Sequence, residues 1–521
     1  MTDIPTFAQR PTTNWGIWHW LERRADIAPG RTALIDGPRR FTYRALHDRV
    51  ASLAGALGQM GVRRGDRVAI LSVNRAEYVE VLFAAAWLGA ILVPLNWRLT
   101  ASELAFQVSD SEPVVLFVDP ELGDLAQALR ARPEAGSIRA AVAFDTDLPV
   151  PPWAAAYGEL SADPPAPAGG FDDPLLIMYT SGTTGRPKGA VLTQRTQLWN
   201  SINIGTAVRL TSDDVTLNVL PMFHIGGIGL FALPTLHVGG TAVLQRRFDP
   251  EEAVRLLEEH RVSAMFGVPS IYLMLLESEA FRRADVSGVR FSCGGAPCPL
   301  RIIEAFQERG LLFQQGYGLT ETAPTCLILP AEDAFRKAGS AGKPAVHVQA
   351  RVVDDDGREV PPDAVGEVWT RGPNLFSGYW RRPRETEEAF EGDWFKTGDL
   401  ARRDAEGFFY IVDRKKDMII SGGENIYPAE VEDVLYRHPA VAEAAVIGVP
   451  HERWGEVPKA IVVLRPGHAL TADELFRFCE PHLARYKIPR LLEVVPALPR
   501  NAAGKVLKRV LREHLAQTGG G

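Results

Sequence analysis

Between residues 66 and 118 the chain alternates between short apolar runs and longer amphipathic stretches. The runs at 67–71, 91–94 and 114–118 are typical of buried strands. The first stretch between them, 75–88, is predicted to be a helix with a capping box made by Asn74 and Glu77, and Thr100 with Glu103 predicts the start of a second helix. Strands that alternate with helices indicate a mostly parallel, doubly wound sheet with helices on both faces.

Three later regions carry other patterns. Residues 146–174 are rich in Pro, Ala and Gly and predict an irregular connection between subdomains. Further α/β segments continue to about residue 330. Residues 348–380 combine short strands with Asp/Gly turns, which indicates a small β-rich subdomain.

The C-terminal part of the chain is expected to form a small α+β unit. One helix should begin at Pro428, and Thr471 with Glu474 should cap another. The apolar side of the first helix carries Val431, Val434 and Leu435. Strands are expected at 444–449, 460–464 and 491–495. The charged segment 413–417 has no apolar anchor, so we expect an N-terminal domain over 1–415 and a C-terminal domain over 416–521.

Composition adds limits to this picture. A chain of 521 residues is too long for a single core, and 46% apolar and 23% charged residues are ordinary for a soluble enzyme. The net charge of −7 argues against nucleic acid as a main partner. The four cysteines form no C-x-x-C pair, which argues against a disulfide framework or a zinc site. With no signal peptide and no apolar run of membrane-spanning length, we expect a cytoplasmic protein.

Residues 179–189 carry the clearest chemistry. Glycines let this backbone bend sharply and present N–H groups, and the hydroxyls and Lys188 add donors, so the segment is suited to holding a polyphosphate. Its hydroxyl residues are Thr180, Ser181, Thr183 and Thr184, and its glycines are Gly182, Gly185 and Gly189. Pro187 breaks the Walker A pattern, and the apolar runs on both sides predict strand–loop–strand rather than strand–loop–helix.

This loop resembles the phosphate loop of the adenylate-forming superfamily, which includes acyl- and aryl-CoA synthetases, adenylation domains and luciferases. Three further segments match family motifs in the family's order: 316–322, 394–400 and 499–505. The resemblance covers nearly the whole chain and is strongest to bacterial fatty-acyl-CoA synthetases. It implies a large N-terminal α/β domain and a small mobile lid that carries the adenylation lysine.

The resemblance implies roles for the nucleotide-binding residues. Tyr317 would stack on adenine, Thr320 would bond the α-phosphate and Glu321 would bind Mg²⁺, which suits a carboxylate placed beside phosphates. Asp399 would hold the ribose with Arg414 as its partner. Taken alone, Glu321 would be interpreted first as a solvated turn acid, and a turn residue after Gly398 is the alternative for Asp399. The full ATP/AMP set is Thr180, Ser181, Gly182, Thr183, Thr184, Gly185, Lys188, Gly295, Ala296, Gly316, Tyr317, Gly318, Thr320, Asp399, Arg414 and Lys505.

The lid residues follow from the same resemblance. Lys505 would bridge the substrate carboxylate and the α-phosphate, and Lys416 would be the hinge about which the lid rotates. The basic run around Lys505 would also be explained by a solvated face. The CoA route would comprise Ser421, Gly422, Gly423 and Trp454, although packing accounts equally well for Trp454.

The acyl pocket is expected at His224, Gly226, Gly227 and Gly294. Amino-acid-activating relatives carry an aspartate where this chain has Ile225, so an apolar acid fits better than an amino acid. The expected catalytic residues are Lys505, Thr184, His224 and Glu321, with Glu321 as the metal ligand.

We therefore expect an ATP-dependent, AMP-forming acyl-CoA ligase that uses ATP, Mg²⁺ and CoA. A medium- to long-chain fatty acid is the first expectation for the substrate, an aryl or cinnamate-type acid is the alternative, and a carrier-protein-loading enzyme is a further rival. The sequence leaves open a homodimer and a weak peripheral contact with membranes.

Overall fold

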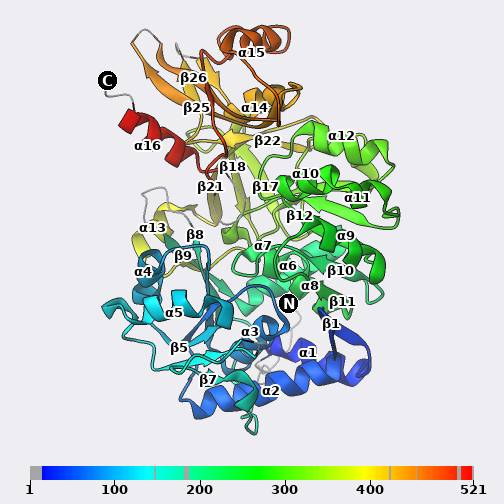
Figure 1. Ribbon diagram of the computed structural model, residues 1–521, viewed down its shortest axis with the longest axis vertical. Coiled ribbons are helices and arrows are strands. Elements are labelled where there is room, and N and C mark those ends of the chain that lie inside the picture. The colour runs from blue at the N-terminus through cyan, green and yellow to red at the C-terminus, as the bar shows by residue number, and fades with distance from the viewer. Residues whose placement is uncertain are drawn as a thin grey trace, which may run out of the picture.

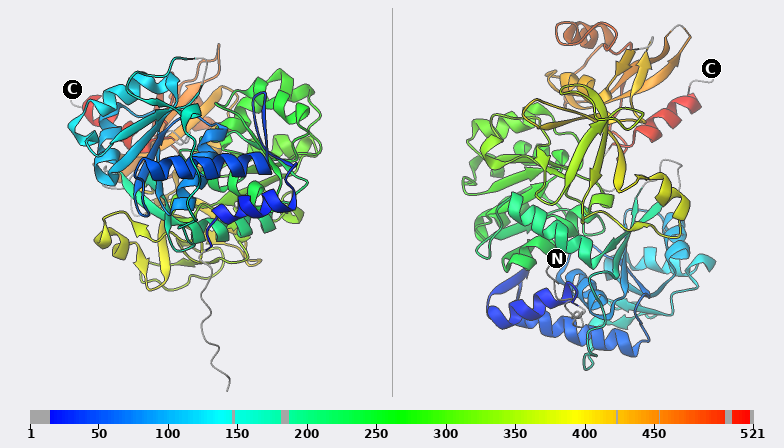
Figure 2. Two further views of the ribbon diagram at one scale, coloured as in Figure 1. Left: turned by 90° about the horizontal axis from the view of Figure 1, so that it is seen from below. Right: turned by 180° about the vertical axis from the view of Figure 1, so that it is seen from behind.

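The computed structural model describes residues 15–145, 148–180, 187–421, 424–452, 454–500 and 506–518. The fold is α/β, with a large N-terminal domain and a small C-terminal domain, as the sequence predicted. In Figure 1 the C-terminal elements lie at one end of the molecule, above a β-rich subdomain and two larger sheets. Figure 2 gives two further views of the same arrangement.

The two larger sheets supply most of the scaffold. From edge to edge, the first consists of β19 (Gly378–Tyr379), β9 (Lys188–Thr193), β8 (Pro174–Thr180), β4 (Ile91–Leu95), β3 (Arg67–Leu71), β5 (Pro113–Val118), β6 (Ala140–Ala143) and β7 (Ala155–Ala156). The second consists of β16 (Lys343–Pro344), β15 (Leu327–Ile328), β14 (Phe313–Tyr317), β13 (Arg290–Cys293), β12 (Ala264–Gly267), β10 (Val215–Asn218), β11 (Thr241–Leu244), β1 (Thr32–Asp36) and β2 (Arg39–Thr42).

Two smaller sheets complete the described strands. The β-rich subdomain contains β17 (Gln349–Val353), β18 (Val365–Arg371), β21 (Trp394–Arg403), β20 (Phe390–Glu391) and β22 (Phe409–Arg414). The sheet of the C-terminal domain contains β24 (Glu424–Ile426), β23 (Ile419–Ser421), β26 (Gly455–Leu464), β25 (Val441–His451) and β27 (Leu491–Val494).

Helices cover these sheets. Those of the N-terminal domain are α1 (Trp18–Ile27), α2 (Tyr43–Gln59), α3 (Ala76–Leu88), α4 (Ala101–Ser111), α5 (Gly123–Arg130), α6 (Gln194–Ala207), α7 (Ile225–Gly229), α8 (Ala232–Val238), α9 (Pro250–Glu259), α10 (Pro269–Glu277), α11 (Glu279–Arg283), α12 (Leu300–Glu308) and α13 (Pro383–Glu388). Those of the C-terminal domain are α14 (Pro428–Tyr436), α15 (Ala472–Cys479) and α16 (Lys508–Thr518). Short 3₁₀ turns are η1 (Pro120–Leu122), η2 (Pro133–Ala135), η3 (Tyr157–Glu159), η4 (Thr320–Thr322) and η5 (Ala331–Asp333).

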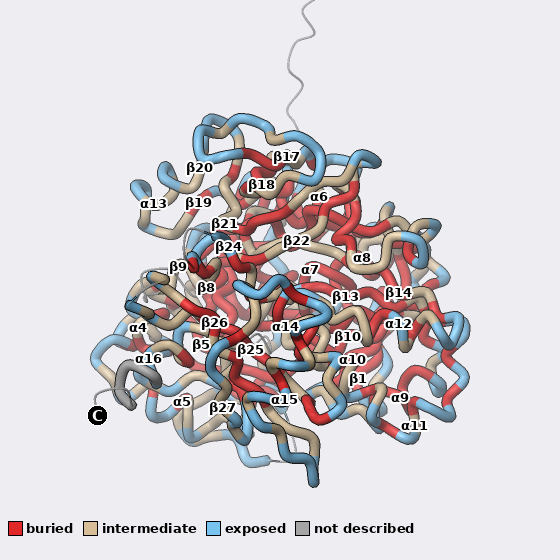
Figure 3. Tube along the Cα trace, turned by 90° about the horizontal axis from the view of Figure 1, so that it is seen from above, coloured by how far each residue is buried: buried red, intermediate tan, exposed pale blue. Residues whose placement is uncertain are grey.

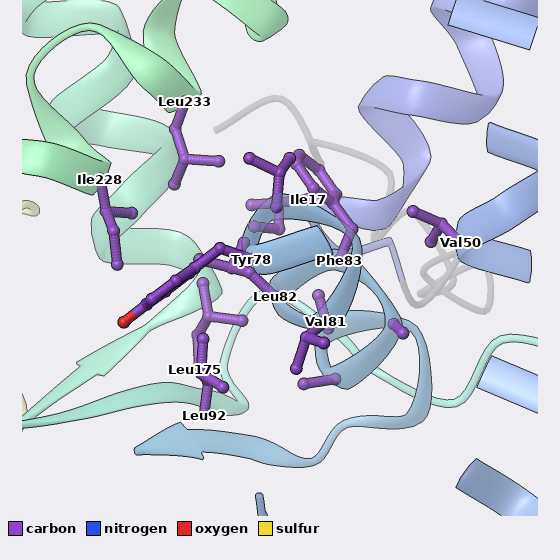
Figure 4. Close-up of a cluster of buried hydrophobic side chains, with 14 of the residues drawn as sticks. Ile17, Val50, Tyr78, Val81, Leu82, Phe83, Leu92, Leu175, Ile228 and Leu233 are labelled. Atoms are coloured by element: carbon purple, nitrogen blue, oxygen red, sulfur yellow. The ribbon is translucent and has the colours of Figure 1, made fainter. Parts of the chain in front are cut away.

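A shared apolar core joins the two large sheets. Alternate residues of β3 point to opposite faces: Val68 and Ile70 enter the shared core, and Ala69 and Leu71 pack on the other side with residues of α4 and α5. All of α3 is buried, so this helix has no solvated face, and its Glu77 and Glu80 are paired with Arg75 and Arg49. Figure 4 shows α3 side chains gathered with Leu92 of β4, Leu175 of β8 and Leu233 of α8. Figure 3 shows buried segments beneath exposed loops.

The local predictions were confirmed where all partners lie within one turn. Thr100 with Glu103 and Thr471 with Glu474 form complete capping boxes. The box predicted at Asn74 and Glu77 is wrong, because α3 has Arg75 as its N-cap and no side-chain cap bond. The Asn74 amide instead donates to Leu220 O at 2.9 Å and Gln245 O at 3.1 Å. Long-range partners have displaced the local one.

The C-terminal domain contains more helices and strands than the sequence predicted. The expected helices and strands are present, but β23, β24 and α16 were missed. β23 and β24 are three residues each, too short to show a clear alternation, and α16 begins in the basic segment around Lys505, for which no helix was predicted. Within the described ranges, no helix is long and apolar enough to cross a membrane.

Candidate active site

One cavity of about 1840 Å³ gathers most of the predicted site residues that the structure describes. It opens between the carboxyl ends of β8, β13 and β14, the β-rich subdomain and the C-terminal domain. The predicted residues that line it are Thr180, Lys188, His224, Gly226, Gly294, Gly295, Ala296, Gly316, Tyr317, Gly318, Thr320, Glu321, Asp399 and Arg414. Ligand sites of open α/β sheets lie at this edge of the strands.

The phosphate-loop strands bring Thr180 and Lys188 to the cavity. β8 and β9 pair antiparallel with Thr180 opposite Lys188, so the predicted strand–loop–strand is confirmed. The Lys188 ammonium lies 5.0 Å from the centre of the Tyr379 ring. Five predicted residues, Ser181, Gly182, Thr183, Thr184 and Gly185, lie outside the described residues.

Glu321 is the centre of a buried polar group. It lies in η4, directly after β14, and its Oε1 accepts a hydrogen bond from Tyr379 Oη at 2.9 Å. Burial raises the pKa of the Glu321 carboxyl above its ordinary value, even though Tyr379 donates to it. The sequence analysis did not single out Tyr379, which is 58 positions away.

This carboxylate fits a magnesium ligand. Mg²⁺ binds commonly through one or two carboxylates together with substrate phosphates, and Glu321 faces the same cavity as Thr180, Thr320 and Lys188. A buried carboxylate is costly unless its charge is offset, and a divalent ion beside Glu321 would offset it. The residues present therefore fit Mg²⁺ held jointly by Glu321 and ATP.

Asp399 is fixed by two partners. Tyr317 Oη donates to its Oδ2 at 2.7 Å, and Arg414 Nε lies 3.3 Å from its Oδ1. Asp399 and Arg414 are cross-strand neighbours on β21 and β22. The predicted adenine, ribose and arginine positions are thus brought together, on elements from both the N-terminal sheet and the β-rich subdomain.

His224 precedes α7 and faces the cavity next to Phe223. Burial and the nearby positive charge of Arg98 lower the pKa of His224 to about 4, so the imidazole is neutral at pH 7. Gly226 lines the cavity, whereas Gly227 does not: a Cβ on Gly227 would lie 2.3 Å from Pro221 O. Gly227 therefore serves the close packing of α7 rather than the pocket wall.

The predicted CoA residues that are described lie elsewhere. Ser421 pairs with Gly455 at the end of β26, next to Trp454, whose ring lies 5.4 Å from the Arg490 guanidinium. None of these residues lines the cavity, and Lys416 is exposed between β22 and β23. Gly422, Gly423 and Lys505 lie outside the described residues. Arg500, Val506, Leu507 and Lys508, which flank the Lys505 segment, do line the cavity.

Comparison with known sequences decides the family. The profile of the AMP-binding enzyme family matches residues 21–380, and that of the AMP-binding enzyme C-terminal domain matches 430–505. The chain belongs to the AMP-binding enzyme family. A feruloyl-CoA synthase from an Amycolatopsis species is 44% identical over 504 residues, which is 96% of this chain and 99% of that protein.

Two solved structures are similar over almost their whole length. The o-succinylbenzoate CoA synthetase of Bacillus subtilis, in complex with its acyl-adenylate intermediate, has a TM-score of 0.83 and 36% identity, covering 95% of this chain and 97% of that one. A Mycobacterium tuberculosis fatty acyl CoA synthetase has a TM-score of 0.76 and 36% identity, covering 96% and 99%. This member of the AMP-binding enzyme family is an ATP-dependent, AMP-forming acyl- or aryl-CoA ligase that uses ATP, Mg²⁺ and CoA.

Proposed function

We propose that this AMP-binding enzyme ligates an aromatic carboxylic acid of the cinnamic type to CoA. The 44% identity to a feruloyl-CoA synthase carries this proposal, and it favours the aryl alternative over the fatty acid that the motifs first suggested. A fatty acid remains the rival substrate, since a fatty acyl CoA synthetase is among the similar structures.

The acyl end of the cavity supports an aromatic ring. Gly294, which follows β13, and Gly316 on β14 both line the cavity, and a Cβ on Gly294 would lie 2.7 Å from Gly316 O, so the two backbones approach closely here. Ser292 Oγ and Gln315 Nε2, on the same two strands, have no hydrogen-bond partner among the described residues. A ring with oxygen substituents supplies partners for such groups, whereas an alkyl chain does not.

Adenylation would proceed at the phosphate end of this cavity. A carboxylate oxygen of the acid attacks the α-phosphorus of ATP and forms a new O–P bond. The bond between the α-phosphorus and the oxygen that bridges to the β-phosphate breaks, and its electron pair leaves with pyrophosphate. Tyr317, Asp399 and Arg414 would hold the nucleoside, and the Thr180–Lys188 loop would hold the phosphates. Mg²⁺ at Glu321 would supply charge neutralisation on the phosphate oxygens. Lys505 would bridge the two anions.

Thioester formation would use the other end of the lid. The CoA thiolate attacks the carbonyl carbon, the C–S bond forms, and AMP leaves with the electrons of the C–O bond. We propose that rotation about Lys416, between domains 1–415 and 416–521, brings Ser421, Gly422, Gly423 and Trp454 to the cavity. A homodimer, a weak membrane contact and a cytoplasmic location stay predictions from the sequence.

Steady-state kinetics with a panel of acids tests the substrate. We expect kcat/KM for ferulic acid to exceed that for dodecanoic and hexadecanoic acids by at least about 100-fold. In Ser292→Ala the preference for ferulic over unsubstituted cinnamic acid should shrink, and Glu321→Gln should abolish AMP release with every acid. A higher kcat/KM for either fatty acid would contradict the aryl proposal and restore its rival.

A further inference from the structure

A buried asparagine links the two halves of the cavity. α6 carries a polar face of Gln194, Gln197, Asn200 and Asn203 that is turned inward. Asn200 uses both ends of its amide: Nδ2 donates to Gly229 O at 2.6 Å, and Oδ1 accepts from Thr325 N at 3.2 Å. It is 1% exposed, so these bonds are made away from water.

The two segments that Asn200 joins have different proposed roles. Gly229 is the last residue of α7, whose N-cap is His224, a residue of the proposed acyl pocket. Thr325 ends residues 319–325, here called the metal loop, which contains Thr320 and Glu321. A Cβ on Gly229 would lie 2.8 Å from Pro324 Cδ and 2.9 Å from Ala323 O. α7 and the metal loop are therefore in direct contact, with one amide bonded to both.

A second buried asparagine holds the metal loop from the β-rich side. Asn374 is fully buried, and its Nδ2 donates to Thr322 O at 2.7 Å and to Thr325 O at 2.8 Å. Two residues later, Phe376 N donates to Glu321 O at 2.9 Å. Asn374 touches the metal loop but is not bonded to α7, which separates its contacts from those of Asn200.

In-line attack needs the carboxylate, on the α7 side, aligned with the α-phosphate, on the metal-loop side. A misplacement of about 1 Å can cost about 100-fold in rate, because the reacting atoms must be pre-aligned. From these contacts we infer that Asn200 is a positioning residue that holds α7 and the metal loop at a fixed distance and orientation to each other. The inference rests on the roles proposed above for His224 and Glu321.

A purely structural role is the competing explanation. Truncating Asn200 leaves Gly229 O and Thr325 N buried without this partner, which by itself destabilises the fold. Asn203 offers a matched control on the same face of α6. It is also fully buried, and its Oδ1 accepts from His347 N and Nδ1, each at 3.1 Å, so its bonds go neither to α7 nor to the metal loop.

The experiment compares Asn200→Ala with Asn203→Ala at equal folded fraction. ATP–pyrophosphate exchange gives the adenylation step, and CoA with supplied acyl-AMP gives the second step. We expect Asn200→Ala to lower kcat for exchange by about 10- to 100-fold, because the reacting groups are no longer aligned. The KM for the acid should change by less than about threefold, and the Mg²⁺ concentration for half-maximal rate should rise. The rate of the second step should fall by less than about threefold. Asn203→Ala should leave unchanged both the ratio of the two half-reaction rates and the Mg²⁺ concentration for half-maximal exchange.

Two more variants separate the two bonds. Asn200→Asp keeps the acceptor for Thr325 N and loses the donor to Gly229 O, so we expect most of the kcat loss with a smaller change in Mg²⁺ dependence. Asn374→Ala should shift the Mg²⁺ dependence and leave the preference among acids unchanged. If Asn200→Ala and Asn203→Ala have the same ratio of half-reaction rates and the same Mg²⁺ dependence, the positioning role of Asn200 is overturned while the proposed function stands. Absence of Mg²⁺-dependent exchange in the wild type would instead overturn the proposed function beneath it.

Discussion

At the scale of single residues, burial sets the charge of the groups around the reacting carboxylate. His224 has a pKa lowered to about 4 by burial and by Arg98, so it borders the cavity as a neutral group at pH 7. The positive charge on that side comes from Arg98 itself, which also lines the cavity and lies 4.8 Å from the centre of the Trp97 ring. We infer that His224 shapes the pocket rather than pairs ionically with the acid.

The lowered pKa predicts a pH dependence of stability. Between pH 4 and 6.5 the unfolded chain binds a proton at His224 that the folded protein does not, so the free energy of unfolding falls as pH falls through this window. The loss from this residue should reach at most about 3 kcal/mol. Urea unfolding at pH 4.5, 5.5 and 7 should show a shallower pH slope for His224→Gln than for the wild type. Parallel slopes would contradict a neutral buried imidazole.

At the scale of elements, a partly buried ion pair attaches the last helix to the rest of the C-terminal domain. Lys508, the first residue of α16, lies 2.8 Å from Glu432 of α14, and Val446 N of β25 donates to the same Glu432 oxygen. Arg512, one turn further along α16, pairs with Asp417 at 2.9 Å. These two pairs fix the first turns of α16, which begins three positions after Lys505 in the sequence.

Breaking that pair should loosen the lid. Lys508→Met leaves the partly buried Glu432 without its cation, and we expect the local unfolding free energy of the C-terminal domain to fall by about 2 kcal/mol. Hydrogen exchange of α14 and β25 measures this directly. The neighbouring Arg509, whose pair with Glu513 is exposed, provides the control: Arg509→Met should change protection by less than about 0.5 kcal/mol. Equal protection in the two variants would contradict an anchoring pair.

Local sequence patterns predicted elements well and long-range contacts poorly. The boxes at Thr100 and Thr471 were predicted because every partner lies within three residues, whereas the same pattern at Asn74 was wrong, since its amide bonds to Leu220 and Gln245. In the cavity, motif residues such as Tyr317 and Asp399 were found in advance. Tyr379, Asn200 and Asn374 were not, because their contacts join distant parts of the chain and no local pattern marks them.

At the scale of the whole molecule, the lid is held against the body by a few contacts at the start of α12. Leu300 N donates to Asp433 of α14 at 3.2 Å, and Arg301 donates to Ala442 O at 3.2 Å. The Arg301 guanidinium also lies 5.2 Å from the centre of the Tyr436 ring. In this pose the residues that flank Lys505 line the cavity and Trp454 does not, as we expect for the proposed adenylation step.

Removing these contacts should shift the balance between the two half-reactions. We expect Arg301→Ala to slow adenylation by about fivefold, the worth of roughly one hydrogen bond and one cation–π contact, while thioester formation from supplied acyl-AMP is unchanged or faster. Arg309, at the other end of α12, bonds only to Phe281 O and Ala284 O of the body in the hydrogen bonds described, so Arg309→Ala is the control. Equal slowing of both half-reactions by Arg301→Ala would argue against two lid poses.

The central claim is that this cavity converts an aromatic acid into an acyl-AMP before CoA enters. Exchange of labelled pyrophosphate into ATP, measured without CoA, tests it most directly. The account predicts Mg²⁺-dependent exchange that requires an aromatic acid such as ferulic acid and is lost in Glu321→Gln. Exchange that is absent until CoA is added, or release of ADP in place of AMP and pyrophosphate, would contradict it.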